Sequence, residues 1–263
     1  MHTDPASAKA PPLPDVIHPL VEAAVRDEIS DRLHYLDDGK AGAGHPEGLT
    51  RKEKELILLS IAYAHMRAAP AQLHARAAIR LGGTMAEIAE VSVLAIIARG
   101  MPAFRMAAMP ALAAAEQESG QAYRYDAAGQ GPAHELQDVR RYVAQALGIR
   151  LPDMWVTLEA IAPYALDGYM MIRQGVLKDG GALPKSLKEL VIIAMDISYA
   201  LTWGSRMHAS QAVRDGATVR QMAEIVALAM LEGGHAVYHT GGAGVMQVAE
   251  EEAAALAEAS RTG

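Results

Sequence analysis

The sequence contains no cysteine, and it has only one phenylalanine and two tryptophans among 263 residues. Without cysteine the chain forms no disulfide, no thiolate nucleophile and no thiolate–metal bond. This composition fits the cytoplasmic location that we expect. β-branched residues are few, whereas Ala, Leu and Met are plentiful. We therefore expect closely packed helices, with Met as an adaptable filler, and no large sheet.

Membrane-spanning runs and blocks of positive charge are not evident either. The most strongly apolar run, LILLSIAYA at 56–64, is too short to span a bilayer. The first residues, MHTDPASAKAPPLPDV, lack the basic and apolar regions of a signal peptide, so we expect a flexible arm over 1–15. The net charge of −7 and the absence of a Lys/Arg block predict that neither nucleic acid nor a membrane is the partner.

What the sequence does contain is an internal repeat. A shift of 134 residues aligns LTRKEKELILLS (49–60) with LPKSLKELVIIA (183–194) without gaps. The same shift aligns PAQLHARAAIRLGGT (70–84) with GSRMHASQAVRDGAT (204–218). The period is that of a domain, so we interpret it as a duplication and not as a solenoid. We expect a first unit over 16–118, a connecting segment over 119–150 and a second unit over 151–260.

The sequence pattern of each unit predicts three helices. The first begins near Thr50, in a TRKE pattern typical of a capping box, and near Pro184. It is apolar almost all round, so it should be the buried central helix. The second begins near Pro70 or Gly204 and ends at a glycine, and the third begins with TMAE or TVRQ, again capping-box patterns. Two further helices are expected, at 134–147 and at 154–177 with a kink at Pro163.

Two histidines occupy matching places in the repeat, His74 and His208. Each should lie near the start of a helix, where unbonded N–H groups favour an anion and the ring could act as general acid or base. The alternative is a buried, hydrogen-bonded His. Glu55 and Glu189 come nineteen residues earlier. Direct contact with the histidines would need a break in the first helix, a steep crossing or a water. Otherwise each is an early-helix Glu favoured by the dipole.

The second unit is richer in unusual polar residues than the first. The candidates for substrate binding are Trp203, Arg206, His235 and Tyr238, together with Arg67 of the first unit. His235 and His239 are spaced like a metal pair, but no third ligand is visible, so we expect neither a metal nor a cofactor. Arg80 and Arg214 could pair with acids of a neighbouring copy.

One acidic residue stands out in an apolar helix of the second unit. Asp196 lies in VIIAMDISYALTW, and a buried acid needs a partner. Its structural role would be a core hydrogen bond to Tyr199 or Tyr63. Because the first unit has no such acid, we expect the second unit to be the active one if only one is active.

The stretch LTRKEKELILLSIAYA…LHARAAIRLGGTMAEIAEV resembles the carboxymuconolactone decarboxylase family, which shares its all-α fold with alkylhydroperoxidase D-like proteins. The resemblance covers both units and implies an all-α fold of two tandem alkylhydroperoxidase D-like units. In peroxidatic relatives the equivalents of Glu55 and His74 belong to a proton relay. Those relatives also carry a C-x-x-C motif, where this chain has Arg67 and Pro70, or Leu201 and Gly204. The cysteine-based peroxidase mechanism is therefore excluded.

The resemblance implies a lyase of the 4-carboxymuconolactone decarboxylase type. It would act on a small carboxylated or lactone metabolite of aromatic-compound breakdown, with His208 and His74 as acid–base groups. The alternative is a non-catalytic helical scaffold or small-molecule binder. An enzyme should show a closed pocket where His, Arg and an acid converge, whereas a scaffold should show histidines with only backbone partners. By resemblance we also expect a homo-oligomer, with a trimer of two-unit chains favoured.

Overall fold

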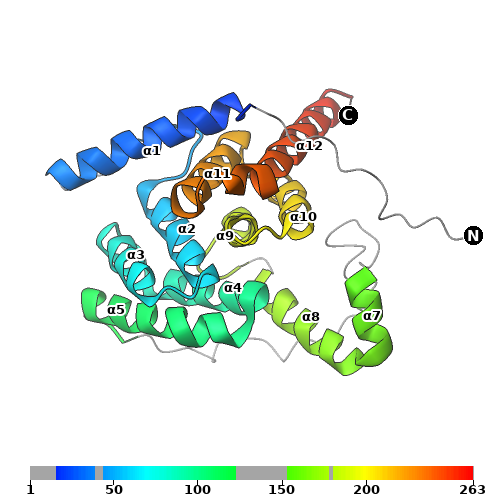
Figure 1. The fold of residues 1–263 in the computed structure, drawn as a ribbon, viewed down its shortest axis with the longest axis horizontal. Coiled ribbons are helices and arrows are strands. Elements are labelled where there is room, and N and C mark those ends of the chain that lie inside the picture. The colour runs from blue at the N-terminus through cyan, green and yellow to red at the C-terminus, as the bar shows by residue number, and fades with distance from the viewer. Residues whose placement is uncertain (1–15, 39–43, 123–152, 178–179, 263) are drawn as a thin grey trace, which may run out of the picture.

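The computed structural model describes residues 16–38, 44–122, 153–177 and 180–262. Within these ranges the chain is helical and has no strand, which confirms the all-α fold (Figure 1). The first-unit helices are α1 (Pro19–Asp38), α2 (Arg51–Ala64), α3 (Ala68–Arg80), α4 (Met85–Ala103) and α5 (Met109–Ser119). The later helices are α7 (Asp153–Ile161), α8 (Pro163–Leu177), α9 (Lys185–Ser198), α10 (Thr202–Arg214), α11 (Val219–Gly233) and α12 (Ala243–Thr262). The expected arm at 1–15 and helix at 134–147 lie outside the described residues.

The duplication is visible in the backbone as well as in the side chains. Helices α2 to α5 repeat as α9 to α12, and α4 and α11 both begin with a complete capping box. Thr50 forms the capping box predicted for α2, whereas Pro184 precedes α9 without a side-chain cap. The turns after α2 and α9 place Met66 and Ala200 at φ of 56° and 65°, an uncommon conformation for residues other than Gly. Equivalent residues thus carry the same backbone strain.

Each unit has a fourth helix that the sequence patterns did not predict. The chain kinks at Gly100 (φ 74°) and at Gly234 (φ 84°), passes through a π-helical turn, and continues as α5 or α12. Arg80 Nε donates to Glu118 of α5 at 2.8 Å. Arg214 Nε makes the equivalent bond to Glu252 of α12 at 2.7 Å. The prediction that Arg80 and Arg214 pair with a neighbouring copy is therefore corrected, because each has an acid on the last helix of its own unit.

The first helix of each repeat is central, as its nearly all-round apolar character predicts. The residues of α2 from Lys54 to Ala64 and those of α9 from Leu187 to Ser198 are buried. Helix α9 runs through the middle of the molecule and packs against α2, α4, α10 and α11 (Figure 1). The two central helices also contact each other, so both units share one core.

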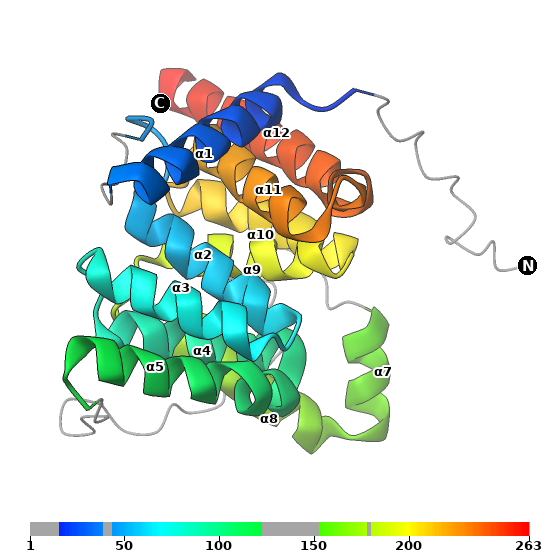
Figure 2. The same cartoon turned by 60° about the vertical axis from the view of Figure 1, so that its left-hand side comes forward.

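The units interlock through a pair of matched glutamates. Glu90 of α4 accepts from the backbone N–H of Leu183 at 2.7 Å and pairs with Lys188 at 2.8 Å. Glu224 of α11 accepts from the N–H of Leu49 at 2.6 Å. Each carboxylate thus satisfies a backbone donor next to the central helix of the other unit. Helices α1 and α8 also cross over, because α1 packs on α11 and α8 packs on α4 (Figure 2).

One helical stretch, Met85–Ser119, is long and apolar enough to cross a membrane by length and composition alone. The apolar run singled out in the sequence, at 56–64, is shorter and lies in α2. In the structure this stretch is kinked at Gly100 and packs against α2, α3 and α9, as a core helix does. The stretch is weak support for a membrane span.

The helix expected at 154–177 with a kink at Pro163 is present as two helices. Helix α7 ends at Ile161 and α8 begins at Pro163, since Pro lacks the N–H that would continue the helix. Both helices lie at one end of the molecule (Figure 2), and α8 reaches back to contact α9. This return path brings a helix from outside the three-helix repeat next to His208.

Candidate active site

Both histidines contact the glutamates that precede them by nineteen residues. Glu55 Oε2 lies 2.7 Å from His74 Nδ1. Glu189 Oε2 lies 2.5 Å from His208 Nδ1. Helices α2 and α9 are continuous, so of the three routes expected for direct contact, a break in the first helix is not the one that the structure uses. Glu55 is nine residues before the end of α2, about 14 Å, and His74 is six residues into α3, about 9 Å. The two side chains bridge the remaining difference.

The histidines do not lie at helix starts. Helices α3 and α10 begin at Ala68 and Thr202, two residues earlier than the sequence patterns predict, so each His is in the second turn. Only the first four backbone N–H groups of a helix lack intrahelical partners. The predicted role of a helix N-terminus in holding an anion beside His is therefore wrong. Any anion next to His208 has to be held by a side chain.

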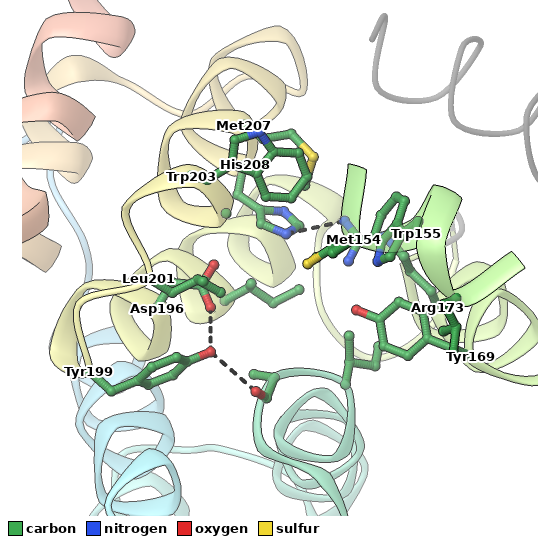
Figure 3. Close-up of a pocket in the computed structure, with 15 residues that line it drawn as sticks. Met154, Trp155, Tyr169, Arg173, Asp196, Tyr199, Leu201, Trp203, Met207 and His208 are labelled. Atoms are coloured by element: carbon green, nitrogen blue, oxygen red, sulfur yellow. Dashed lines mark hydrogen bonds between the residues drawn. The ribbon is translucent and has the colours of Figure 1, made fainter. Parts of the chain in front are cut away.

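That side chain is Arg173, which enters from α8. Its Nη2 lies 3.1 Å from His208 Nε2, and the Arg side chain is buried. A guanidinium can only donate hydrogen bonds, so Nε2 is the acceptor and carries the lone pair. The ring proton is then on Nδ1 and is donated to Glu189. His208 is thus neutral, with a basic nitrogen directed toward Arg173 (Figure 3).

The first-unit pair has a different electrostatic setting. Arg51 Nε donates to Glu55 at 3.0 Å. Burial alone would raise the pKa of Glu55, but the His74 hydrogen bond and the Arg51 charge more than offset it and lower the pKa. In the second unit the residue equivalent to Arg51 is Lys185, which pairs with Asp215 instead, at 3.0 Å. In the first unit, therefore, the nearby arginine, Arg51, contacts the glutamate of the pair. In the second unit the nearby arginine, Arg173, contacts the histidine.

A cavity of about 500 Å³ opens beside the second-unit pair. Its walls come from α4, α7, α8, α9 and α10, and they are mostly apolar and aromatic (Figure 3). The Trp155 ring lies 6.0 Å from that of Tyr169 and 6.1 Å, edge on, from that of Trp203. The Arg173 guanidinium lies 5.9 Å from the centre of the Trp155 ring, which attracts a cation. His74 is not among the residues that line this cavity.

An acid also reaches the cavity. Asp196 lines it, is 2% exposed, and accepts from the Tyr199 hydroxyl at 2.8 Å, which confirms the expected hydrogen bond. Burial raises the pKa of Asp196 to about 6, and a protonated His208, the Tyr199 hydrogen bond and Arg173 limit that rise. The equivalent residue of the first unit is Ala62. His208, Arg173 and Asp196 therefore meet in this cavity.

The predicted substrate-binding residues are not all brought together. Trp203 lines the cavity. Arg67, Arg206 and His235 are exposed and do not line it. Tyr238 is buried elsewhere, where its hydroxyl accepts from the His18 backbone N–H at 2.8 Å.

The pair of histidines with metal-like spacing does not form part of a larger cluster. Ring nitrogens of His235 and His239 lie 3.2 Å apart. Over the part of the chain that the structure describes, no group of three or more His, Asp or Glu side chains is arranged to hold a metal ion.

Sequence reasoning missed Arg173, the cation nearest to His208. The available signal was a lone charge in the apolar stretch YMMIRQGVL of α8. That pattern shows that the Arg is unusual, but it does not show which helix α8 packs against. Trp155, Tyr169 and Met207 were missed for the same reason, because their common wall exists only after α7 and α8 fold back.

The fold and the site define a helical protein of two duplicated units, in which a buried Glu–His pair faces an aromatic cavity. Two segments, 32–114 and 163–237, match the model of the carboxymuconolactone decarboxylase family, and together they make up more than half of the chain. The chain therefore belongs to the carboxymuconolactone decarboxylase family. The second segment contains Arg173, Glu189, Asp196 and His208.

Individual proteins add little to this family assignment. A solved structure from Burkholderia xenovorans LB400, assigned as a carboxymuconolactone decarboxylase, is 26% identical over 45% of this chain and 91% of that chain, with a TM-score of 0.42. No curated protein sequence matches the chain significantly.

Proposed function

We propose that the chain is an enzyme of the decarboxylase type, acting on a small carboxylated or lactone metabolite in the cavity of the second unit. The observation that carries the proposal is the lone pair of His208 Nε2, held by Glu189 on one side and facing Arg173 on the other. The scaffold alternative requires histidines with only backbone partners. His208 instead has two charged side-chain partners beside a cavity, which favours the enzyme.

Arg173 supports recognition of a carboxylate. Arg173 is 2% exposed, and its Nε has no hydrogen-bond partner among the described residues. A substrate carboxylate could accept from this buried donor, and charge-assisted bonds of this kind are stronger than neutral ones. The apolar body of a lactone would then lie against Trp155, Tyr169 and Trp203. A cavity of about 500 Å³ is in the size range of small-metabolite sites.

His208 supports proton transfer in the same place. Once a substrate carboxylate takes the Arg173 donors, Nε2 is available to accept a proton from a carbon next to a carbonyl. Glu189 then stabilises the imidazolium through Nδ1–H. Return of the proton at another carbon shifts a double bond. Where the carboxylate leaves as CO₂, the bonding pair enters the conjugated lactone and one proton must be added to the product.

Other properties of the family remain part of the proposal. A role in aromatic-compound breakdown comes from the resemblance, and a cytoplasmic location comes from the cysteine-free composition. A homotrimer would reproduce six units from three two-unit chains. The exposed side chains of Met101, Met106 and Met109 support such subunit contacts. Single exposed apolar side chains are ordinary, but three on one segment are typical of an interaction surface.

The test is turnover of 4-carboxymuconolactone and of related small lactone carboxylates, followed by proton NMR in D₂O. This readout detects deuterium incorporation without CO₂ loss as well as decarboxylation. We expect His208→Gln to lower kcat by about 100-fold or more, the usual loss for a general acid or base. The matched His74→Gln variant should stay within about threefold, because His74 does not line the cavity.

Two results would decide against this function. Undiminished turnover in the His208→Gln variant removes this ring from the mechanism. Saturable binding of these compounds by the wild-type chain, with neither deuterium incorporation nor CO₂ release, shows a small-molecule binder instead.

A further inference from the structure

The geometry of His208 raises a question of proton supply, which rests on the function proposed above. Arg173 offers Nε2 only donors, so the resting ring accepts a proton and has none to give from that nitrogen. Loss of CO₂ consumes a proton, because the carbon that loses the carboxylate gains a hydrogen. Decarboxylation in this cavity therefore needs a second group that holds a proton.

Asp196 lies where such a group is needed. A Cβ atom added to Gly204 would come within 2.5 Å of Asp196 Oδ2, so the carboxyl group occupies the space that a side chain at 204 would fill. Gly204 and His208 are four residues apart on α10 and share one face of that helix. The Asp196 carboxyl thus packs against the face of α10 that carries the His208 ring, and both residues line the cavity (Figure 3).

The hydrogen bonds around Tyr199 favour a protonated Asp196. The single hydroxyl hydrogen of Tyr199 has two acceptors within reach, Asp196 Oδ1 at 2.8 Å and the Ala98 carbonyl at 3.1 Å. With Asp196 ionised, one of these contacts lacks a proton. With Asp196 protonated, the carboxyl donates to Tyr199 and the hydroxyl donates to Ala98, so both contacts are satisfied.

The charged and titratable groups around Asp196 lie on four helices. His208 on α10 when its ring is protonated, the Tyr199 hydrogen bond and Arg173 on α8 favour the ionised carboxylate, whereas Glu189 on α9 opposes it. On α4, Arg99 stacks on the Tyr199 ring with its guanidinium carbon 4.4 Å from the ring centre. Burial is the largest influence, and it raises the pKa of Asp196 to about 6.

We propose that Asp196 is the proton donor of this site. The C–C bond to the carboxylate breaks, CO₂ leaves, and the bonding pair enters the conjugated lactone. The Asp196 proton is added to the substrate carbon, and the carboxyl becomes a carboxylate. Tyr199 then turns its hydrogen from Ala98 to Asp196 and stabilises the new charge. Solvent returns the proton, so the enzyme is unchanged after one turnover. The first unit has Ala62 at this position and no donor there.

Two measurements test the assignment separately from the proposed function. The first is infrared difference spectroscopy of the ligand-free wild-type chain against Asp196→Asn across pH, which follows the carboxylic-acid C=O stretch. We expect a band that only the wild type shows, titrating with a midpoint near pH 6 or above. A midpoint below about pH 4.5 would mean that Asp196 is ionised throughout, and it would overturn the proposal whatever the turnover result.

The second measurement is the rate profile of the NMR turnover assay. We expect kcat/KM of the wild type to fall tenfold per pH unit above about pH 6, because the donor is then ionised. Asp196→Asn should lose about 100-fold or more in kcat, keep KM within about threefold, and lack this alkaline limb. The control is Asp215→Asn, which removes a carboxylate at the far end of α10 that pairs with Lys185. It should keep both the rate and the limb.

The outcomes separate the two proposals. An active wild type with an Asp196→Asn variant that keeps its rate and its alkaline limb overturns the role of Asp196 and leaves the function standing. An inactive wild type counts against the proposed function, and the infrared midpoint then still decides whether Asp196 holds a proton.

Discussion

Replacing Arg173 by Met should hardly change the stability of the folded chain, whereas it should weaken carboxylate binding. Arg173 is 2% exposed, but within the described ranges it forms no ion pair with a carboxylate. Its contacts are the neutral His208 ring, at 3.1 Å, and the face of Trp155. A buried charge with such partners gains little net stability over an apolar side chain of similar length. We expect the free energy of unfolding to change by less than about 1 kcal/mol.

Arg51 provides the matched comparison. It is also largely buried, but it bonds Glu28 at 2.7 Å and Glu55 at 3.0 Å. Arg51→Met would leave two buried carboxylates short of a cation, a change that typically costs about 3 to 5 kcal/mol. At about 2 to 4 °C per kcal/mol for chains of this size, the melting temperature should fall by roughly 6 °C or more.

The assay combines thermal and urea unfolding, at one fixed protein concentration, with calorimetric titration of a small dicarboxylate. Because a charge-assisted hydrogen bond contributes about 1.5 to 3 kcal/mol, Arg173→Met should bind the dicarboxylate roughly 10- to 100-fold more weakly. The reasoning is refuted if Arg173→Met loses as much stability as Arg51→Met and binds the dicarboxylate as tightly as the wild type. Arg173 would then be a structural residue.

Two further predictions concern Asp196 and its neighbour. Because the folded pKa of Asp196, about 6, lies above its ordinary value of 3.8, its contribution to stability is present below about pH 4 and is lost as pH rises through 6. Relative to the wild type, Asp196→Asn should therefore gain up to roughly 3 kcal/mol between pH 4 and pH 8 in urea unfolding. A pH-independent difference would contradict the raised pKa. Gly204→Ala should cost about 1 to 3 kcal/mol, because the new Cβ collides with the Asp196 carboxyl. Gly168→Ala in α8 meets no atom within 4 Å and should be neutral or stabilising by up to about 1 kcal/mol, and equal effects would count against the collision.

The repeat and the helical fold could be predicted because their determinants are local. Capping boxes at Thr50, Thr84 and Thr218 use side chains three residues apart, so the sequence shows where these helices start. The nearly all-round apolar character of α2 and α9 likewise indicates central burial without knowledge of their partners. The fourth helix of each unit escaped prediction, because Gly100 and Gly234 look like helix ends while the chain continues through a π-helical turn.

In the site, too, the features set by local sequence differ from those set by tertiary packing. The sequence by itself determined that matched Glu and His side chains recur nineteen residues apart, that no cysteine is available, and that one acid, Asp196, falls in an apolar helix and needs a partner. Only the tertiary structure decided that Glu189 contacts His208 directly, because that depends on how α9 and α10 cross. It also decided that Arg173 faces His208, because α8 belongs to no local pattern of the repeat. Contacts between helices distant in sequence depend on the packing of the whole core, and the spacing of residues along one helix does not determine that packing.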